Sequence, residues 1–163
     1  MSKLNASYLA GFIDGEGYIA LKVDKNKDNG NLYYTPILKI AQTDESIIRW
    51  MKESFGGWYY KREYGEDSHS RDSYYWTLTG TNLKPFLQKV CPYLKLKKKQ
   101  CELLLKKIRM QETLGDELPY KGISTINKQR KQKMQVNETY RQQRRNEIEE
   151  IYNKLRELNK RGK

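Results

Sequence analysis

The sequence of 163 residues lacks the side chains that metal clusters and disulfide frameworks need. It has two cysteines, Cys91 and Cys101, ten positions apart, and one histidine, His69. A structural zinc site needs several Cys or His ligands at close spacing, and a disulfide framework needs more than one pair. Both are therefore excluded, and any catalytic chemistry depends on carboxylates, lysines, tyrosines or a bound metal ion.

Long apolar runs are also missing. No run approaches the roughly 18 to 20 residues that span a bilayer, and Met1–Asn5 does not open a signal peptide. We therefore expect a soluble intracellular protein, although the sequence does not distinguish the cytoplasm from an organelle. Hydrophobic residues make up only 37%, but 13 Tyr, 3 Trp and 3 Phe supply large apolar surfaces. One compact domain with a modest core fits this composition better than disorder.

Positive charge is abundant and unevenly distributed. The chain has 32 Lys or Arg against 20 Asp or Glu, a net charge of +12. Residues 1–90 carry 12 basic and 11 acidic side chains, whereas residues 91–163 carry 20 and 9, a net charge of +11. This asymmetry predicts a near-neutral folded part, a basic second part and a polyanionic partner, with nucleic acid favoured.

Hydrophobic periodicity predicts an α+β domain in residues 1–121. Apolar spacing of three or four residues indicates helices, and alternation indicates strands. Hairpins alternate with helices, so we expect one four-stranded antiparallel sheet with its helices on one face. Pro36 favours an edge position or a bulge for its strand. The expected elements are helix 5–13, strands 18–24 and 32–41, helix 43–55, strands 58–64 and 73–79, and helices 82–90 and 97–111.

Residues 122–163 form a different kind of segment. Residues 122–145 contain seven Lys or Arg and one acid, Glu138, with little apolar periodicity, which is typical of a solvated arm. From Asn146 onward, apolar residues such as Ile151 and Leu155 recur at helical spacing. We therefore predict a basic arm followed by an amphipathic helix that docks on the domain.

The segment Leu9-Ala10-Gly11-Phe12-Ile13-Asp14-Gly15-Glu16-Gly17 is the most informative in the chain. It predicts a short helix with small residues four apart, Gly11 and Gly15, and an acid at its end. The helix dipole disfavours negative charge at a C-terminus, so Glu16 requires an explanation. One explanation is solvent exposure in a turn. The other is a divalent cation, shared with a second helix packed against these small residues.

These nine residues closely resemble the LAGLIDADG motif, and the chain resembles the single-motif LAGLIDADG homing endonucleases. The resemblance extends over residues 4–111: the element order matches the αββαββα core of the family, Lys39–Gln42 resembles its glutamine segment, and Pro92–Gln100 resembles its lysine segment. It implies a homodimer that lays a saddle-shaped sheet in the DNA major groove and cleaves DNA with Mg²⁺ or another divalent cation.

The resemblance also implies roles for particular residues. Glu16 and the Gly15 carbonyl would bind the metal, and Glu16, Gln42 and Lys97 would be the catalytic residues. The sequence departs from the usual motif with Glu16 in place of Asp, and a pocket arginine of some relatives would fall near Ser46. The motif helices would form the dimer interface through Leu9, Ala10, Gly11, Ile13 and Asp14, although we also favour a structural role for Asp14 at the helix end.

Residues that bind DNA are expected on one face of the strands and in the basic segments. Lysine recognises guanine edges and aspartate recognises cytosine N4, while basic arms contact phosphates. The alternatives are an ordinary solvated sheet face and a plain linker, and the face of strand 58–64 that meets DNA stays open. The expected residues are Tyr18, Lys22, Asp24, Tyr33, Thr35, Lys39, Tyr75 and Thr77 on the strands, Lys98, and Lys128, Arg130, Lys131, Lys133, Arg141, Arg144 and Arg145 in the arm.

The leading functional hypothesis is therefore a homodimeric, metal-dependent, intron-encoded endonuclease that cuts double-stranded DNA at a long pseudo-palindromic site. The alternative is a protein of the same fold that binds DNA or intron RNA without cleavage, as regulators and maturases do. A basic structural nucleoprotein is a third class, and it would bind DNA without sequence preference.

Overall fold

The computed structural model describes residues 3–25, 27, 30–64, 71–117 and 128–160. The order of elements is the predicted one. The bounds are α1 (Lys3–Glu16), β1 (Gly17–Lys25), β2 (Leu32–Gln42), α2 (Glu45–Phe55), β3 (Trp58–Arg62), β4 (Ser73–Leu78), the short 3₁₀ turns η1 (Gly80–Asn82) and η2 (Cys91–Tyr93), α3 (Leu83–Val90), α4 (Lys98–Glu117) and α5 (Lys128–Lys160).

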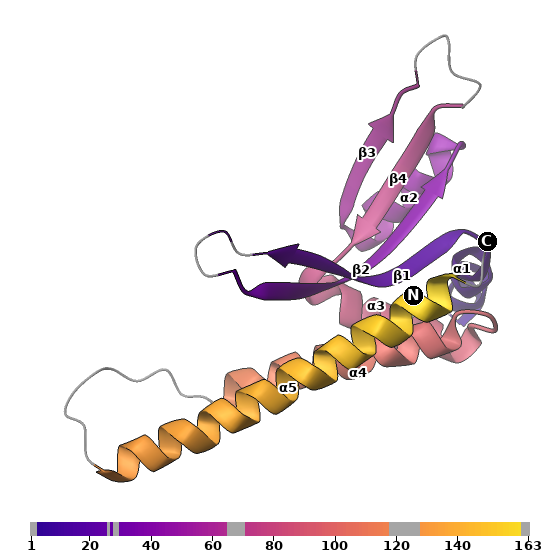
Figure 1. Cartoon of the computed structure of the whole chain (residues 1–163). Coiled ribbons are helices and arrows are strands. Elements are labelled where there is room, and N and C mark those ends of the chain that lie inside the picture. Colours follow the sequence, from indigo (N-terminus) through magenta and orange to yellow (C-terminus); the bar gives the residue numbers. More distant parts are fainter. Residues whose placement is uncertain (1–2, 26, 28–29, 65–70, 118–127, 161–163) are drawn as a thin grey trace.

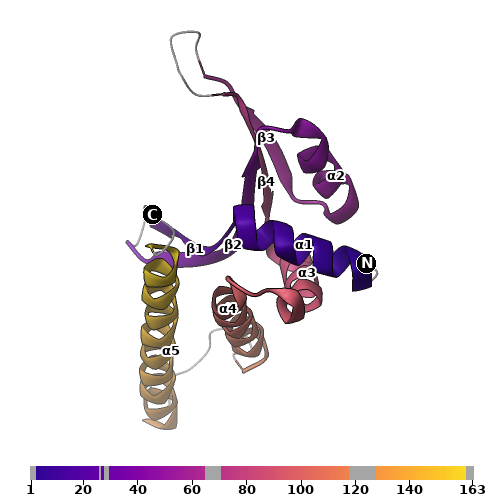
Figure 2. The same cartoon turned by 90° about the vertical axis from the view of Figure 1, so that its right-hand side faces the viewer.

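The described strands form one antiparallel sheet of four strands in the order β1-β2-β4-β3 (Figure 1). Helices α1, α2 and α3 lie on the same side of this sheet (Figure 2). The opposite side is open in the view of Figure 1. The predicted α+β class is thus confirmed, with helices on one face and a free face on the other.

The side chains of β4 alternate as expected. Trp76 and Leu78 are fully buried on the helical side.

The position of Pro36 in β2 is tolerated because of the local hydrogen-bond pattern. Pro36 lies in an inner strand, so the predicted edge position is wrong for the strand as a whole. Its local environment is nevertheless that of an edge, because the ladder between β2 and β4 stops at Leu38. The Pro36 carbonyl accepts instead from Thr79 Oγ1 at 3.0 Å, and the missing N–H removes no ladder hydrogen bond.

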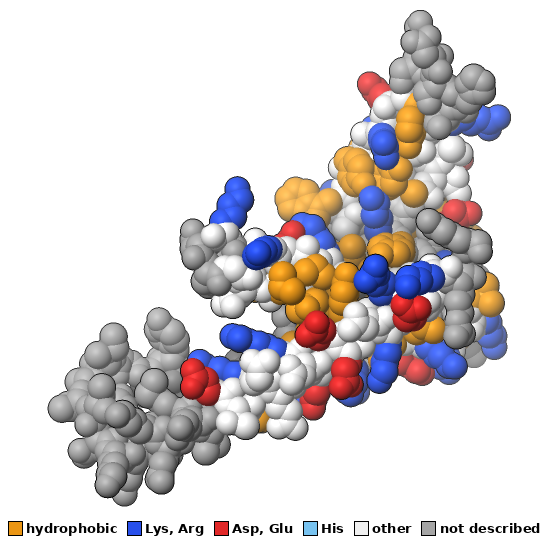
Figure 3. Space-filling view, in the orientation of Figure 1, with side chains coloured by type: hydrophobic (Ala, Val, Ile, Leu, Met, Phe, Trp, Pro, Cys, Tyr) orange, Lys and Arg blue, Asp and Glu red, His pale blue; other side chains and the backbone are white. Residues whose placement is uncertain are grey.

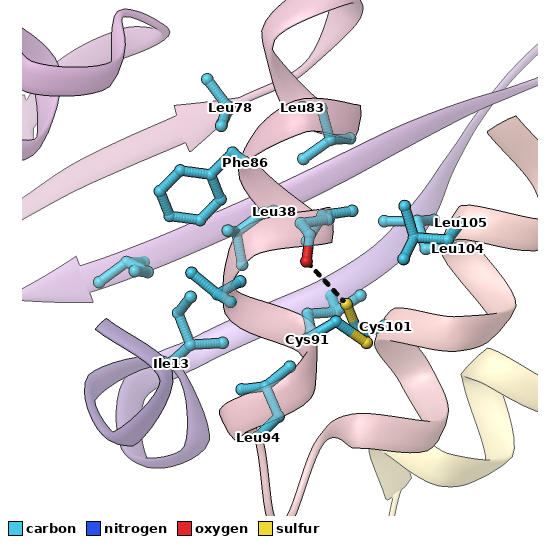
Figure 4. Packing of buried hydrophobic residues seen from close by; sticks show 14 of the residues in the cluster. Ile13, Leu38, Leu78, Leu83, Phe86, Cys91, Leu94, Cys101, Leu104 and Leu105 are labelled. Atoms are coloured by element: carbon cyan, nitrogen blue, oxygen red, sulfur yellow. Dashed lines mark hydrogen bonds between the residues drawn. The ribbon is translucent and has the colours of Figure 1, made fainter. Parts of the chain in front are cut away.

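The core lies between the sheet and helices α1, α3 and α4 (Figure 4). Aromatic rings fill the region under β4: Phe86 packs against Phe55 with ring centroids 5.0 Å apart and against Trp76 at 5.6 Å. The Trp76 indole donates to the Gly56 carbonyl at 2.8 Å, so its polar group is satisfied inside the core. This core holds the end of α1 in a fixed position relative to the sheet.

Helix α1 is longer than predicted, and the chain passes directly from it into β1. The helix begins at Lys3 rather than at an Asn5 cap, and it ends at Glu16. The next residue, Gly17, already pairs with Ile40 in the sheet. A Cβ atom on Gly17 would lie 2.7 Å from the Ile13 carbonyl oxygen, so this sharp transition requires glycine.

Helix α2 has the caps that its sequence predicts. The Asp44 side chain accepts from the backbone N–H of Ser46 at 2.8 Å, and Gly56 ends the helix with a φ of 73°. Arg49, the nearest arginine to Ser46, forms a salt bridge with Glu45 inside this helix. It is therefore engaged within α2.

Helix α5 begins at Lys128, so the prediction of an irregular arm up to residue 145 is wrong for residues 128–145. The rest of that arm, residues 122–127, lies outside the described residues. The C-terminal half of α5 docks as predicted, with Ile151 and Leu155 buried against the core cluster. Asn159 Nδ2 donates to the Ile19 carbonyl of edge strand β1 at 3.0 Å, which covers part of that edge. No helix in the described part of the chain is long and apolar enough to cross a membrane.

One lysine side chain is buried between the sheet and helix α4. Lys107 of α4 is 1% exposed, and its ammonium donates to the Tyr34 carbonyl of β2. Tyr34 in turn packs against Tyr152 of α5, with ring centroids 5.5 Å apart. Burial lowers the pKa of Lys107 from 10.5 to about 8.

Candidate functional site

The C-terminal end of α1 brings together residues that are far apart in the sequence. Glu16 is the last residue of the helix, and its side chain is exposed. The segment between η2 and α4, which contains Lys97, folds back over the same helix end. A carboxylate and a lysine, both predicted as catalytic residues, therefore occupy one site.

Asp14 holds this segment in place. Its two carboxylate oxygens accept from the backbone N–H groups of Lys95 at 2.7 Å and Lys97 at 2.9 Å. Hydrogen bonds from backbone amides to an ionised carboxylate are among the stronger ones in proteins. The geometry supports the structural role expected for Asp14, and the carboxylate is committed to its own chain.

The ammonium group of Lys97 binds the end of α1. It donates to the carbonyls of Ile13 at 2.9 Å, Asp14 at 2.8 Å and Gly15 at 3.4 Å. These carbonyls lack intrahelical partners because the helix ends here. Burial lowers the pKa of Lys97, while the negative charges of Asp14 and Glu16 oppose that shift. The lysine acts as a positively charged cap on the helix.

Gln42 is the last residue of β2. Gly17 pairs with Ile40, so Gln42, two residues further along β2, continues past the start of β1 towards the end of α1. Its Oε1 accepts from the Thr43 backbone N–H at 2.8 Å and from Thr43 Oγ1 at 3.3 Å. The amide group is therefore held in one orientation at this end of the sheet.

A divalent cation fits the chemistry of this helix end. An exposed carboxylate, a backbone carbonyl and the negative end of a helix dipole are oxygen donors of the kind that Mg²⁺ and Ca²⁺ prefer. Glu16 and the Gly15 carbonyl would hold such an ion. Within the described ranges, however, no three His, Cys, Asp or Glu side chains gather into a metal site.

The exposed face of α1 differs from the predicted interface. Leu9, Ala10 and Ile13 are 0% exposed and pack inside their own chain, so the prediction that they contact a partner is wrong. Every third or fourth position of this motif points into the core, which leaves the small residues outside. Gly11 and Gly15 face open space, because a Cβ atom on either would have no neighbour within 4 Å.

Aromatic side chains flank these glycines. Tyr8 is 56% exposed and stacks on Phe12 with ring centroids 6.4 Å apart. Tyr8 also meets Trp50 of α2 edge to face at 6.4 Å. Small residues beside aromatic rings form a surface on which a second helix can pack closely.

The strand residues predicted to bind DNA share the open face of the sheet. Between β1 and β2, the register pairs Tyr18 with Lys39, Lys22 with Thr35 and Asp24 with Tyr33. Between β2 and β4, it pairs Lys39 with Thr77 and, two residues further along β2, Ala41 with Tyr75. Paired residues point to the same face, so all eight predicted residues lie on one surface.

The structure also decides the orientation of β3, which the sequence left open. Trp58 pairs with Thr77, Tyr60 with Tyr75 and Arg62 with Ser73, so these three side chains of β3 join the open face. Trp58 is 70% exposed. Sequence reasoning missed them because both faces of β3 carry aromatic and charged residues.

A cluster of stacked rings and cations lies at the centre of this open face. The rings of Tyr60 and Tyr75 stack with centroids 4.6 Å apart and an interplanar angle of 5°. Lys39 Nζ lies 4.4 Å from the Tyr75 centroid and 5.2 Å from that of Tyr60. Further along the same face, Lys22 and Asp24 of β1 form a salt bridge of 2.9 Å. Figure 3 shows basic and hydrophobic side chains next to one another over the sheet.

The basic segments are only partly described. Lys98, Arg141 and Arg145 are exposed. Arg144 is held within α5, where it donates to Tyr140 Oη and contacts Glu147 Oε2 at 3.3 Å. The expectation of phosphate contacts also named Lys128, Arg130, Lys131 and Lys133. These four belong to the first turns of α5, and their side chains lie outside the described residues.

The sequence pattern of one family matches most of the region that builds this site. The match is to the LAGLIDADG endonuclease family and extends over residues 9–108, from the motif helix to α4. The chain belongs to the LAGLIDADG endonuclease family. The predicted resemblance is thereby confirmed, and the motif helix, the open sheet face and the lysine segment are parts of this family fold. A search of curated protein sequences found no match.

Solved structures of LAGLIDADG proteins share the fold. The homing endonuclease I-CvuI, in complex with its target in the presence of Ca, is 25% identical with a TM-score of 0.56, and the match covers 70% of this chain and 71% of that one. The archaeal intron-encoded homing endonuclease I-Vdi141I, complexed with DNA, is 20% identical with a TM-score of 0.53, covering 68% and 70%. I-GzeII, in complex with a DNA target, is 22% identical with a TM-score of 0.55, covering 72% of this chain and 39% of that one.

Proposed function

We propose that this LAGLIDADG protein is a homodimeric, metal-dependent endonuclease that cleaves both strands of a long, pseudo-palindromic DNA site. The observation that carries the proposal is the placement of Glu16. Its exposed carboxylate ends a helix whose outer face bears the small residues Gly11 and Gly15. Two copies packed through this face bring two such carboxylates together, and a bound cation makes their proximity favourable.

The open sheet face supports double-stranded DNA as the substrate. It presents lysine, arginine, aspartate and tyrosine side chains from four strands, and the chain carries a net charge of +12. Such side chains recognise base edges in a major groove, while the surplus of positive charge supplies affinity for phosphates. I-CvuI, I-Vdi141I and I-GzeII were each solved in complex with DNA. We propose that the open face of the sheet is the surface of this chain that would contact DNA.

The helix end supports a metal-dependent reaction. A divalent cation at this position supplies an activated water and stabilises the leaving oxygen of the phosphodiester. Glu16 and the Gly15 carbonyl would bind it, and Gln42 and Lys97 would orient water and phosphate around it. Asp14 fixes the Lys97 segment through two backbone hydrogen bonds. I-CvuI was solved with its target in the presence of Ca, and with a different target in the presence of Mg, where the DNA was not cleaved.

The comparison with a longer relative supports the homodimer. This chain matches 39% of I-GzeII, so that protein has room for a second unit of the same size within one polypeptide. A chain with a single motif reaches the same arrangement by pairing with its own copy. Because I-Vdi141I is intron-encoded, we propose the same genetic setting and an intracellular location for this protein.

The test uses the host-gene sequence in its form without the intron. In this DNA the two sequences that flank the intron form a continuous junction, which the protein should cleave. The wild-type protein should linearise a plasmid carrying this junction when Mg²⁺ is added. The Glu16→Gln variant should bind the junction with similar affinity and cleave at least about 100-fold more slowly, because the metal ligand is lost. Glu53→Gln, which removes an exposed acid on α2, is the matched control and should cleave normally.

Three outcomes would contradict the proposal. Full cleavage by the Glu16→Gln variant would show that the metal lies elsewhere. Tight and specific binding by the wild-type protein, without cleavage at any divalent metal concentration, would instead indicate a DNA- or RNA-binding regulator or maturase with this fold. Binding without sequence preference, revealed by competitor DNA, would indicate a structural nucleoprotein.

A further inference from the structure

The open face of the sheet carries a carboxylate. Of the strand residues that the structure describes on this face, Asp24 is the one acidic side chain, whereas Lys22, Lys39 and Arg62 are basic. A carboxylate on a surface that contacts DNA is repelled by the phosphates. Asp24 therefore weakens the binding of DNA unless a base donates a hydrogen bond to it.

Asp24 is paired with a lysine on the same strand. Lys22 Nζ lies 2.9 Å from Asp24 Oδ1, and the two side chains are 61% and 50% exposed. Both residues lie towards the end of the β1–β2 hairpin that points away from α1 (Figure 1). Exposed ion pairs contribute little to stability, so both groups are available for further hydrogen bonds. The pair presents a donor and an acceptor side by side.

A G·C base pair offers the complementary groups in the major groove. Guanine O6 accepts and cytosine N4 donates, and the hydrogen bond between them holds these two atoms about 2.9 Å apart. This spacing matches that of Lys22 Nζ and Asp24 Oδ1. The ammonium can therefore donate to O6 while the carboxylate accepts from N4, and neither the ion pair nor the base pair has to open.

The other base pairs fit less well. An A·T pair also offers a donor, adenine N6, and an acceptor, thymine O4. The thymine methyl group beside O4 obstructs the lysine, however, and adenine N7 beside N6 is an acceptor that repels the carboxylate. In the G·C pair, guanine N7 is instead a second acceptor for the lysine. Reversal to C·G brings donor against donor and acceptor against acceptor.

We propose that Lys22 and Asp24 together recognise one G·C base pair in each half of the DNA site. The inference rests on the proposed function, because it requires the sheet to lie along the major groove.

The length of β1 gives the position of this base pair. Lys22 and Asp24 lie five and seven residues after Gly17, the first residue of the strand. At about 3.3 Å per residue, these separations are about 17 and 23 Å. With a rise of about 3.4 Å per base pair, the G·C pair lies about five to seven base pairs outward from the DNA next to Glu16.

The test measures the equilibrium affinity for the junction without the intron and for variants in which each base pair is replaced in turn, in both halves of the site. Divalent cations are left out, so cleavage does not interfere. Replacing the predicted G·C pair should weaken binding of the wild-type protein at least about tenfold.

Asp24→Asn should change this preference, because asparagine recognises adenine through N6 and N7. The variant should bind the A·T replacement at least as well as the original G·C site. It should also bind random competitor DNA more tightly than the wild type does, since one negative charge has been removed.

Asp72→Asn is the matched control. Asp72 forms a second lysine–aspartate pair, with Lys61 at 2.9 Å. Lys61 pairs with Tyr74, so its side chain lies on the face of the sheet opposite to that of Asp24. This variant has the same net charge as Asp24→Asn, but it should keep the base preference of the wild type at every position.

A chemical change in the DNA tests the same contact with the wild-type protein. Replacing the predicted guanine by 7-deazaguanine removes N7 and keeps the base pairing. It should weaken binding of the wild type several-fold and binding of Lys22→Met far less, because only the wild type donates to this edge.

The results separate this inference from the proposed function. Specific binding with the same base profile in the wild type and in Asp24→Asn would overturn the inference and leave the proposed endonuclease standing. A requirement spread over two neighbouring base pairs would overturn it as well. Binding without preference at any position would refute the proposed site-specific function, and this inference with it. A G·C preference that is lost in Asp24→Asn and kept in Asp72→Asn would support the inference.

Discussion

The buried lysine under the sheet gives the sharpest stability prediction. Lys107 is 1% exposed, and the described structure records one hydrogen bond from its ammonium, to the Tyr34 carbonyl. Burial of this charge lowers its pKa from 10.5 to about 8. Replacement by methionine keeps the length and the apolar stem of the side chain and removes the charge. We expect Lys107→Met to stabilise the protein at neutral pH.

The magnitude follows from the pKa. The difference between 10.5 and about 8 corresponds to roughly 3 kcal/mol of unfavourable free energy for the charged form. The substitution leaves the Tyr34 carbonyl without its donor, which costs about 1 to 2 kcal/mol. The net gain in the free energy of unfolding at pH 7 is therefore about 1 to 2 kcal/mol.

The pH dependence has a definite sign. The unfolded chain keeps the Lys107 proton up to about pH 10.5, while the folded chain releases it near pH 8. The unfolded state thus binds more protons between these values, and the stability of the wild type rises with pH in this window. Between pH 7 and 9, this single group should add about 1 kcal/mol to the wild-type stability, whereas Lys107→Met should lack this contribution.

The assay is urea unfolding at pH 7 and pH 9, followed by circular dichroism. Lys106→Met is the matched control, because Lys106 precedes Lys107 on α4 but is exposed, and its free energy of unfolding should match that of the wild type at both values. A Lys107→Met protein less stable than the wild type at pH 7 would refute the reasoning. So would a wild-type pH response identical to that of the variant.

Three further predictions concern the motif helix and the sheet. Gly17→Ala should lower the free energy of unfolding by about 2 kcal/mol or more in urea titrations, because its Cβ would lie 2.7 Å from the Ile13 carbonyl oxygen; an unchanged midpoint would show that the transition relaxes. Gly11→Glu should convert the proposed dimer to a monomer in sedimentation experiments without loss of helix content, and a persisting dimer would place the interface elsewhere. Arg62→Ala should reduce the slope of log K for DNA against log salt by about 1, and an unaltered slope would remove Arg62 from the DNA surface.

The sequence by itself determined the family, the order of the elements and much of the site. Alternation in Ser73–Leu78 oriented Trp76 and Leu78 inward, because a strand with one apolar face has only one favourable register. The motif and the lysine segment indicated Glu16 and Lys97, which meet at the end of α1. The charge difference between the two parts of the chain indicated a polyanionic partner.

Other features were decided only by the tertiary structure. The motif residues Leu9 and Ile13 were expected at a partner and instead fill their own core, since the sequence shows that a helix has an apolar stripe but not which surface covers it. The face of β3 was ambiguous because both of its faces carry aromatic and charged residues. Residues 128–145 lack an apolar stripe, yet they continue a docked helix, and extending a helix through lysine, arginine and glutamine costs little once it has formed.

The burial of Lys107 and the contacts of Lys97 were also decided only by the tertiary structure. Both residues sit in a lysine-rich stretch where composition predicts solvated side chains. The packing of α4 against β2 selected one lysine for burial, and the carbonyls at the end of α1 selected another as a cap. The sequence specifies how many charges the chain carries, whereas the folded backbone decides which of them leave water, because only it creates the acceptors that replace water.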